Sequence, residues 1–293
     1  LVNSLAHRTT WLRSDLLFEP DNEKMGCYEN KEKRMFKKAA FLLAIAAIVA
    51  CRCKCNKKKK NLPLIGEKAP AFNAMTTQGP VNFPQDYAGS WVILFSHPAD
   101  FTPVCTTEFM MFQAMKKEFE EINTKLIGLS VDSLSSHNAW LRTIEEKVEF
   151  NGIRNEKITF PLIDDLSGRI ADKYGMIQPK ADDTKTVRAV FIIDPAGTIR
   201  AILYYPLSNG RNLHEIKRLV IALQATDGFQ IATPANWNPG DDIILPPPAT
   251  EEDIKTRLAL QSDDVKCSDW FICFKKLPHE VLMTKIVMKK DCF

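Results

Sequence analysis

Residues 106–266 contain no cysteine, although the 293-residue chain has eight. The cysteines lie before this stretch, at Cys27, Cys51, Cys53, Cys55 and Cys105, and after it, at Cys267, Cys273 and Cys292. A small secreted protein that depends on disulfides distributes them through its core. The spacing therefore excludes a disulfide framework, and it predicts a body that folds in a reducing compartment with a few selected reactive thiols.

A strong net charge is also absent, because the total is only +3, but the charge is divided unevenly. Residues 1–60 hold 14 of the 39 Lys and Arg residues and 6 of the 36 Asp and Glu residues, a balance of +8. The remaining 25 basic and 30 acidic residues leave residues 61–293 with a balance of −5. We do not expect a mildly acidic body to bind nucleic acid, which is therefore excluded from the predicted partners.

The N-terminal region lacks an apolar run long enough to span a membrane. Residues 39–50 are apolar, with Lys37 and Lys38 before them and a cluster of cysteines and lysines at 51–60 after them. As a helix this run would span about 18 Å at the usual rise per residue, less than the ~30 Å of the hydrocarbon core. Its length and flanks instead fit the hydrophobic region of a signal peptide.

Three interpretations of residues 1–60 stay open. The first is a signal that begins near Met35 and is cleaved. The second is a tether through residues 39–60, in which the cysteines are acylated and the lysines contact anionic lipid at a membrane surface. The third is a disordered extension or a sequence artefact. The first two predict a secretory, endomembrane or membrane-tethered protein, and the third leaves a cytoplasmic one.

From residue 61 onward apolar strands alternate with helical patterns, and no internal repeat is visible. Strands are predicted at 91–96, 126–132, 160–164, 188–194 and 199–204, with a hairpin turn at 195–197 between the last two. Helical spacing runs from Cys105 to Leu126 and recurs around Trp140, Ile170 and Leu219. Strands interleaved with helices predict an α/β fold whose sheet is mostly parallel with an antiparallel edge.

Beyond residue 228 the pattern changes. Pro234, Pro239 and residues 246–248, which are all proline, interrupt regular structure before a short helical piece at 251–260. We therefore divide the chain into a basic N-terminal extension at 1–60, a main domain at 61–228 and a small C-terminal extension at 229–293.

Cys105 is the most informative of the cysteines. It follows a buried-type strand and a loop with Pro98 and Pro103, and it lies at the start of a helical pattern. Unpaired backbone N–H groups and the helix dipole stabilise negative charge there, and the thiolate is the nucleophilic form of cysteine. A lone cysteine is more often a buried inert thiol, but this position predicts a cysteine that reacts with peroxides.

Residues 62 to about 280 resemble a peroxiredoxin of the one-Cys type, in the peroxiredoxin-six subfamily. The signature Pro98-x-x-x-Thr102-x-x-Cys105 is complete, with His97 before it and Thr106-Thr107-Glu108 after it. Residues 187–194 and 208–212 match the segments that carry the family's active-site arginines, here Arg188 and Arg211, and residues 232–241 match the subfamily's C-terminal extension. The resemblance implies a thioredoxin-like fold, an antioxidant thiol peroxidase without metal or other cofactor, and a homodimer or larger homo-oligomer.

In the mechanism that the resemblance implies, the thiolate of Cys105 attacks one peroxide oxygen and becomes a sulfenic acid. Arg188 is expected to favour the thiolate and to stabilise charge on the leaving oxygen. Thr102 is expected to accept hydrogen bonds from the thiol and the peroxide, and Pro98 to cover the thiolate. Arg211 is expected to support this cluster.

Three neighbouring residues have less specific expected roles. Glu108 is expected to hold an arginine in place and not to transfer protons. His97 either tunes Cys105 or packs structurally, and both interpretations stay open. His137 matches a subfamily pattern, but we interpret it as a structural residue at a helix start.

A peroxidase with one reacting cysteine needs an external thiol, such as glutathione or a thioredoxin-like protein, to reduce its sulfenic acid. The chain offers a second route, because Cys267 and Cys273, with aromatic residues between them, resemble the C-terminal pair of archaeal and bacterial members. The resemblance makes Cys273 the candidate that attacks the sulfenic acid of the partner subunit, with Cys267 as its exchange partner or substitute. The alternative is two incidental thiols on an aromatic-lined tail.

Other activities compete with the peroxidase interpretation. Some mammalian members carry phospholipase A2 activity on a Ser/His/Asp set, and Ser90 matches the serine, but Pro84 and Ala196 stand at the other two positions, so the triad is absent. A redox sensor that relays oxidation to a partner, or a holdase chaperone, would use the same Cys105. A thioredoxin-like reductase is disfavoured because no second cysteine lies near Cys105.

Overall fold

The computed structural model describes residues 34–35, 37–38, 40–41, 62–182, 184–259 and 262–288. The chain is divided into two units, Leu1–Asn61 and Leu62–Phe293. Most of the predicted signal or anchor segment lies outside the described residues, as do Cys292 and the four N-terminal cysteines. No helix among the described residues is both long enough and apolar enough to cross a membrane.

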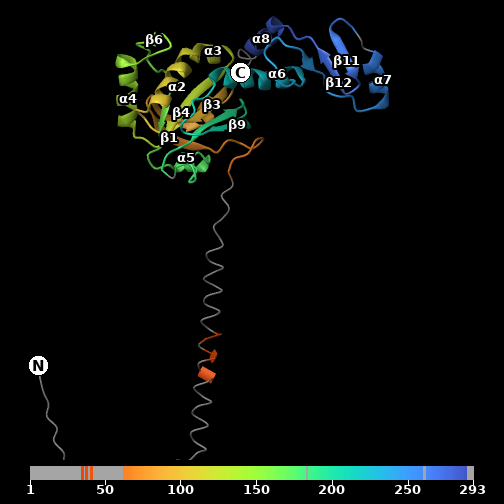
Figure 1. The fold of residues 1–293 in the computed structure, drawn as a ribbon. Helices are drawn as coiled ribbons and strands as arrows, with labels where there is room; N and C mark the ends of the chain where they lie inside the picture. The colour runs from red at the N-terminus through yellow and green to blue at the C-terminus, as the bar shows by residue number, and fades with distance from the viewer. Residues whose placement is uncertain are drawn as a thin grey trace, which may run out of the picture. The chain divides into compact units, whose positions relative to one another are not determined.

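A seven-stranded sheet forms the centre of the second unit (Figure 1). Its strands are β1 (Phe72–Thr76), β2 (Gly79–Phe83), β3 (Trp91–Ser96), β4 (Thr124–Ser130), β7 (Leu162–Asp164), β8 (Arg188–Ile193) and β9 (Ile199–Tyr205), in the order β2-β1-β7-β4-β3-β8-β9. The central strands β7, β4 and β3 are parallel, and the pairs on either side of them are antiparallel. The predicted α/β fold and the β8–β9 hairpin are confirmed. The sheet was predicted to be mostly parallel with an antiparallel edge; its parallel strands form the centre, and antiparallel pairs lie on both sides of them. The β1–β2 hairpin, which was not predicted, adds antiparallel pairing on the other side.

Helices and short ribbons connect the strands. The helices are η1 (a 3-10 helix, Gln85–Tyr87), α2 (Pro103–Ala114), α3 (Lys116–Glu121), α4 (Leu134–Lys147), α5 (Arg169–Lys173), α6 (Leu213–Phe229), α7 (Glu251–Ala259) and α8 (His279–Met288). A two-stranded ribbon, β5 (Glu149–Phe150) with β6 (Ile153–Arg154), follows α4.

Strand β3 is buried along its whole length because side chains cover both faces of the sheet. Successive residues of a strand point to opposite faces. Ile93 and Phe95 pack in one core cluster with residues of α2, α3 and α6, whereas Val92 and Leu94 pack in a second cluster with residues of α5. A continuous apolar run is what a strand between two covered faces requires.

The helical pattern predicted from Cys105 to Leu126 is wrong in its extent. The structure divides it into α2 and α3, with Met115 between them, and places Leu126 on β4. The chain turns between α3 and β4 at Asn123, which has a φ of 51°. Leu126 is buried on its strand just as it would be on a helix, so apolar spacing alone could not show where the helix ends.

The C-terminal extension forms a small sheet and a helix that returns to the main domain. Strands β10 (Ile243–Ile244), β12 (Ile272–Lys275) and β11 (Val265–Asp269) are antiparallel in the order β10-β12-β11. Helix α8 packs against α6, and its Leu282 and Ile286 join the core cluster that contains Val220. Cys267 and Cys273 lie opposite each other on a hairpin, and not on an irregular tail.

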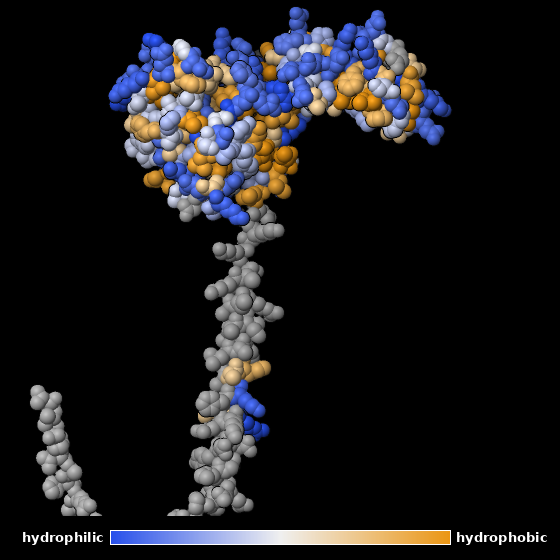
Figure 2. All heavy atoms as spheres, viewed as in Figure 1, coloured by the Kyte–Doolittle hydropathy of each residue, from blue (hydrophilic) through white to orange (hydrophobic). Residues whose placement is uncertain are grey.

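Apolar side chains also lie on the surface, on the side of the main domain where β9 is found (Figure 2). Strand β9 forms one edge of the seven-stranded sheet, and its Tyr204 is 43% exposed. The outer side of an edge strand carries backbone N–H and C=O groups that another chain can pair with. This edge therefore presents both apolar side chains and backbone groups at the surface.

Replacing Phe95 by alanine is expected to lower the free energy of unfolding by about 3–5 kcal/mol, the usual cost of removing a buried phenyl ring. Phe95 has no exposed surface, and its ring stacks on that of Phe112 with centroids 4.2 Å apart. Urea unfolding measures the change. The matched control Phe271→Ala removes the same atoms from a side chain that is 52% exposed, and it should cost less than about 1 kcal/mol. Equal losses for the two variants would contradict this account of the core.

Candidate active site

Cys105 lies in the first turn of α2, where the chain passes from the centre of the sheet into a helix (Figure 1). Strand β3 ends at Ser96, and residues 97–102 lead to α2, which begins at Pro103. Thr102 is the N-cap residue and has an extended backbone, with φ −106° and ψ 141°. Proline suits the first helical position because its φ is already fixed near the helical value. Cys105 is thus the third residue of the helix, and it has no exposed surface.

Arg188 contacts the sulfur of Cys105 directly. It is the first residue of β8, which pairs with β3. Its Nη1 donates a hydrogen bond to Cys105 Sγ at 3.3 Å. Its Nε and Nη2 donate to the carbonyl oxygen of Leu207 at 2.9 and 2.7 Å. The bonds to Leu207 fix the plane of the guanidinium group and leave Nη1 facing the sulfur.

Glu108, one turn after Cys105 on α2, binds two arginines. Its Oε2 accepts from Nη1 of Arg188 and Nη2 of Arg211, both at 2.7 Å. Its Oε1 accepts from Nε and the backbone N–H of Arg211, both at 2.9 Å. Burial acts to raise the pKa of Glu108, but the charges and hydrogen bonds of Arg211 and Arg188 together outweigh it and hold the pKa below its usual value.

The three charged side chains form a buried cluster with one excess positive charge. The side chains of Arg188, Arg211 and Glu108 are 2%, 0% and 3% exposed. A buried charge is costly unless a partner neutralises it. A thiolate at Cys105, which Arg188 already contacts, would neutralise the cluster.

The loop before α2 holds the remaining two residues that the sequence assigned to catalysis. Pro98 is buried and Thr102 is half-buried. The hydroxyl of Thr102 donates to the carbonyl oxygen of Ala99 at 2.8 Å. Because its hydrogen is used in this way, the Thr102 oxygen is left as a hydrogen-bond acceptor.

Two histidines meet at Asp100, a residue that the sequence pattern did not single out. Asp100 Oδ1 lies 2.9 Å from His97 Nε2, and Asp100 Oδ2 lies 2.8 Å from His137 Nδ1. The backbone N–H of Asp100 donates to Asp132 Oδ2 at 3.0 Å. His137 Nε2 lies 3.0 Å from the carbonyl oxygen of Ile163. These contacts join the loop before α2 to the end of β4, to α4 and to β7.

His97 therefore forms its hydrogen bond with the loop carboxylate, and its Nδ1 is buried with no hydrogen-bond partner among the described residues. Burial lowers the pKa of His97 and outweighs the opposing effect of Asp100. Burial acts to raise the pKa of Asp100, but hydrogen bonds from His137 and His97 outweigh it and hold the pKa well below its usual value.

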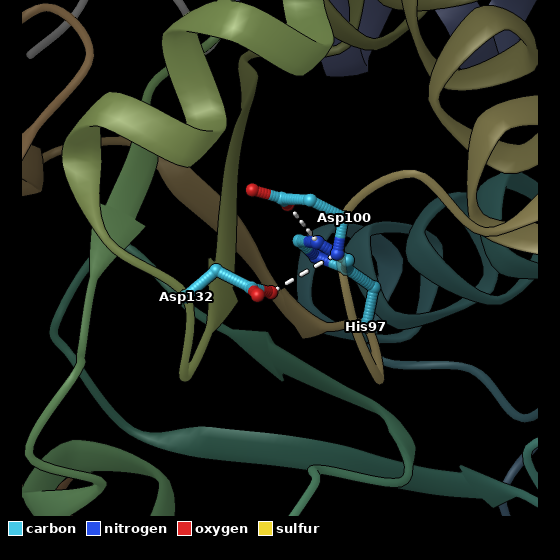
Figure 3. Close-up of side chains that lie close together, drawn as sticks. All are labelled: His97, Asp100 and Asp132. Atoms are coloured by element: carbon cyan, nitrogen blue, oxygen red, sulfur yellow. Dashed lines mark hydrogen bonds and ion pairs between the residues drawn. The ribbon is translucent and has the colours of Figure 1, made fainter.

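His97, Asp100 and Asp132 offer three ligand-type atoms within 4.8 Å of one another. Hydrogen bonds already join Asp100 to both of the other residues (Figure 3). These hydrogen bonds hold the loop before α2 in place.

Cys267 and Cys273 form a disulfide across the β11–β12 hairpin. Cys273 is fully buried, while Trp270 and Phe271 at the turn are 37% and 52% exposed. The hairpin lies well away from α2 in Figure 1. The structure thus pairs these two cysteines with each other, and Cys105 is free.

Two family models match separate parts of the chain. Residues 65–202 match the AhpC/TSA family, and residues 222–259 match the C-terminal domain of 1-Cys peroxiredoxin. A peroxiredoxin of Methanosarcina mazei is 60% identical over 215 residues, which cover 73% of this chain and 98% of that protein. A peroxiredoxin of Aquifex aeolicus is 52% identical over 227 residues, which cover 74% of this chain and 98% of that protein.

Two solved structures share the fold. A yeast mitochondrial 1-Cys peroxiredoxin, whose thiol is resolved via the glutathione/thioredoxin systems, has 39% sequence identity and a TM-score of 0.63, covering 74% of this chain and 100% of its own. Peroxiredoxin 6 of Arenicola marina, in a mutant form, has 33% identity and a TM-score of 0.62, covering 73% of this chain and 98% of its own.

Acidification is expected to destabilise the fold in two steps. The pKa values of His97, Glu108 and Asp100 are all lower in the folded chain, so the unfolded chain binds more protons as the pH falls. The stabilisation from His97 is complete above its unfolded pKa of 6.5 and declines below it. The stabilisation from Glu108 and Asp100 is complete above their unfolded pKa values of 4.5 and 3.8 and is lost toward their folded pKa values. Urea unfolding from about pH 8 to about pH 2 measures both steps.

Glu108→Gln is expected to be less stable than the wild type at neutral pH, because it leaves two buried arginines without their carboxylate. It should also lose the part of the second step that comes from Glu108 and keep the part that comes from Asp100. The control Glu149→Gln changes a carboxylate whose side chain is 53% exposed, and it should keep both steps. An unfolding free energy that stays constant across this pH range would contradict the assignment.

Proposed function

The chain belongs to the peroxiredoxin family, and from this premise we propose that Cys105 is the cysteine that peroxide oxidises. Members of the family are thiol peroxidases, so the protein is an antioxidant oxidoreductase that reduces peroxides with electrons from thiols. The observation that supports Cys105 most strongly is its contact with Arg188, which is itself held by Glu108 inside a buried cluster.

The proposed reaction begins when Cys105, as a thiolate, attacks the nearer oxygen of the peroxide. An S–O bond forms while the O–O bond breaks, and the departing oxygen takes up a proton and leaves as water, or as an alcohol if the peroxide is organic. Cys105 becomes a sulfenic acid. Negative charge moves from the sulfur to the departing oxygen, and Arg188 Nη1 is placed to stabilise that charge.

The other residues of the site are proposed to orient these groups. The Thr102 oxygen, left as an acceptor, would bind the hydrogen of the peroxide and align its O–O bond, and Pro98 would keep water from the thiolate. Arg211 and Glu108 act on the sulfur only through Arg188, as positioning residues. His97 is proposed to be a positioning residue as well, because its hydrogen bond goes to Asp100 and holds the loop.

The sulfenic acid is proposed to be resolved by the C-terminal pair. The thiolate of Cys273, from a partner subunit, attacks the sulfur of the sulfenic acid, so that a Cys105–Cys273 disulfide forms and hydroxide leaves as water after protonation. The thiolate of Cys267 then attacks Cys273, forms the hairpin disulfide and releases Cys105 as a thiolate. The register of β11 and β12, which places Cys267 opposite Cys273, supports the second exchange.

This route requires both sites to open, because neither Cys105 nor Cys273 has exposed surface. We propose that the first turn of α2 and the β11–β12 hairpin rearrange before the sulfurs meet. A thioredoxin-like protein would then reduce the hairpin disulfide. Glutathione would be the reductant if the sulfenic acid is instead resolved directly.

A homodimer or larger homo-oligomer follows from this route, because the hairpin lies away from α2 in the same chain (Figure 1). Strand β9 supports the proposal, since it is an edge strand beside a surface rich in apolar side chains (Figure 2).

Contact of residues 39–60 with a membrane surface stays a prediction, because most of these residues lie outside the described part of the chain.

Cys105→Ser is expected to abolish peroxide reduction, and Arg188→Lys to lower kcat/KM by about 10²–10³-fold, the usual effect of removing one donor that stabilises developing charge. Lysine cannot donate to Leu207, Glu108 and the sulfur from one planar group. Stopped-flow measurement of hydrogen peroxide consumption gives kcat/KM. The matched control is Arg200→Lys, an arginine that pairs with Asp227 at 2.6 Å outside the site. A kcat/KM within about threefold of the wild type for Arg188→Lys would contradict the role of Arg188.

One equivalent of hydrogen peroxide, followed by an alkylating quench and peptide mapping, tests the resolving step. The wild type should accumulate the Cys267–Cys273 disulfide. The Cys267→Ser variant should trap a Cys105–Cys273 disulfide between two chains, because the second exchange cannot occur. The Cys273→Ser variant should retain a sulfenic acid at Cys105. The three products differ in mass without reductant. A sulfenic acid that persists at Cys105 in the wild type and in both variants would contradict resolution by the C-terminal pair and leave an external thiol to resolve it. Unreacted Cys105 would contradict the peroxidase site itself.

A further inference from the structure

Phe101 has a backbone conformation that is unfavourable for any residue with a Cβ atom, and it lies in the loop that leads to Cys105. Its φ is 55°, in the left-handed region. Its side chain is 56% exposed, so burial of the ring does not offset the strain. Strain of this kind persists only where the surrounding structure imposes it. The neighbours of Phe101 must therefore be held firmly by other contacts.

Asp100, the residue before Phe101, is held at its carboxylate and at its backbone. The carboxylate oxygens lie 2.9 Å from His97 Nε2 and 2.8 Å from His137 Nδ1. The backbone N–H donates to Asp132 Oδ2 at 3.0 Å (Figure 3). The residue that precedes the strained one is thus fixed by three hydrogen bonds.

The ring of His137 is bound at both nitrogens. Nδ1 faces the carboxylate of Asp100, and Nε2 lies 3.0 Å from the carbonyl oxygen of Ile163. Both partners are acceptors, and a histidine ring donates from both nitrogens only as the imidazolium. The bond to Asp100 is then charge-assisted, which makes it about twice as strong as a bond between neutral groups. His137 therefore ties the loop firmly to α4 and β7.

Trp140, three residues after His137 on α4, contacts the same region. The rings of Trp140 and His97 stack with centroids 5.1 Å apart. The indole N–H of Trp140 donates to Thr106 Oγ1 at 3.2 Å, and the Thr106 hydroxyl donates to the carbonyl oxygen of Thr102 at 2.9 Å. Residues three apart lie on the same face of a helix. One face of α4 therefore contacts both the loop and the first turn of α2.

We propose that Asp100 and His137 are positioning residues for the peroxidase reaction, which hold the loop of residues 97–102 in its strained conformation. They act through Thr102, whose hydroxyl donates to the carbonyl oxygen of Ala99, the residue before Asp100, at 2.8 Å. This bond leaves the Thr102 oxygen free to accept from the peroxide only while the loop keeps its shape. These roles rest on the proposed function, and they give His137 more than the structural role expected from the sequence.

Asp100→Asn is expected to lower kcat/KM for hydrogen peroxide about 100-fold, the usual effect of a small misplacement of an orienting group. The amide keeps the shape of the carboxylate but cannot accept from a histidine at both ends. Adding Phe101→Gly should recover about tenfold, because glycine adopts a positive φ without strain. Phe101→Gly alone should change kcat/KM by less than about threefold, since the loop is already held. A role in stability alone would not produce this rescue.

His137 is tested by a pair of variants. In His137→Asn the amide can donate to Asp100 from the place of Nδ1, whereas His137→Leu has a side chain of similar size without a donor. The asparagine variant should have a kcat/KM at least about tenfold higher than the leucine variant, the usual effect of one hydrogen bond to a charged group. Equal values for the two variants would contradict the role of His137.

Stopped-flow measurement of peroxide consumption gives kcat/KM, and urea unfolding checks that each variant is folded in the assay. The matched control is Asp86→Asn, because the exposed carboxylate of Asp86 also accepts a backbone N–H, from Asn82 at 2.7 Å. This control should stay within about threefold of the wild type. If Asp100→Asn folds poorly, Asp132→Ala removes the acceptor of the Asp100 N–H from a half-buried position. It should lower kcat/KM about tenfold and recover with Phe101→Gly.

The wild type separates this proposal from the proposed function. A wild type that does not consume peroxide would contradict the peroxidase function itself. An active wild type whose Asp100→Asn and Asp132→Ala variants are equally active would overturn the positioning role alone. The same holds if Phe101→Gly recovers no activity in either variant.

Discussion

The carboxylate of Glu108 is the group on which the candidate active site depends. It binds Arg188 and Arg211 together, so two cations from different parts of the chain lie close to each other in the interior. Without the carboxylate these cations would repel each other and would lack the charge that offsets their loss of hydration. Because Glu108 is one turn after Cys105 on the same helix, the position of the carboxylate also fixes where the arginines stand relative to the sulfur.

The sheet makes this arrangement possible by placing distant segments side by side. Strands β3 and β8 are antiparallel neighbours, so the end of β3 lies next to the start of β8, where Arg188 is found. The loop of residues 97–102 connects the end of β3 to α2, which carries Cys105. Burial of β3 on both faces holds the strand rigidly between two core clusters. A second set of contacts, from His97 and His137 to Asp100, holds the loop itself. The sulfur is thus positioned from the helix, from the neighbouring strand and from the loop.

The regions that contain Cys105 and the C-terminal cysteine pair have different structural settings. Cys105 is free, buried and surrounded by charged groups, whereas Cys267 and Cys273 form a cross-strand disulfide beside exposed aromatic side chains. A buried thiol beside a guanidinium is suited to a small substrate such as a peroxide. A hairpin with an exposed turn is suited to contact with a protein reductant. Helix α8 links the second region back to α6, and so to the core on which the first depends.

The sequence by itself determined the strand 91–96, the β8–β9 hairpin and the cysteine at a helix start, because these are local patterns. The arginines at positions 188 and 211 were identified through the resemblance of their segments to a known family. It could not show that the helix after Cys105 breaks at Met115, since buried helix and buried strand have the same apolar composition. Nor could it show the role of Asp100, which is one carboxylate among many until folding brings His97 and His137 to it. Only the tertiary structure decided that Glu108 joins both arginines and that the C-terminal cysteines lie opposite each other. Each of these depends on contacts between residues far apart in the chain or on the register of two strands, and local patterns carry no information about either.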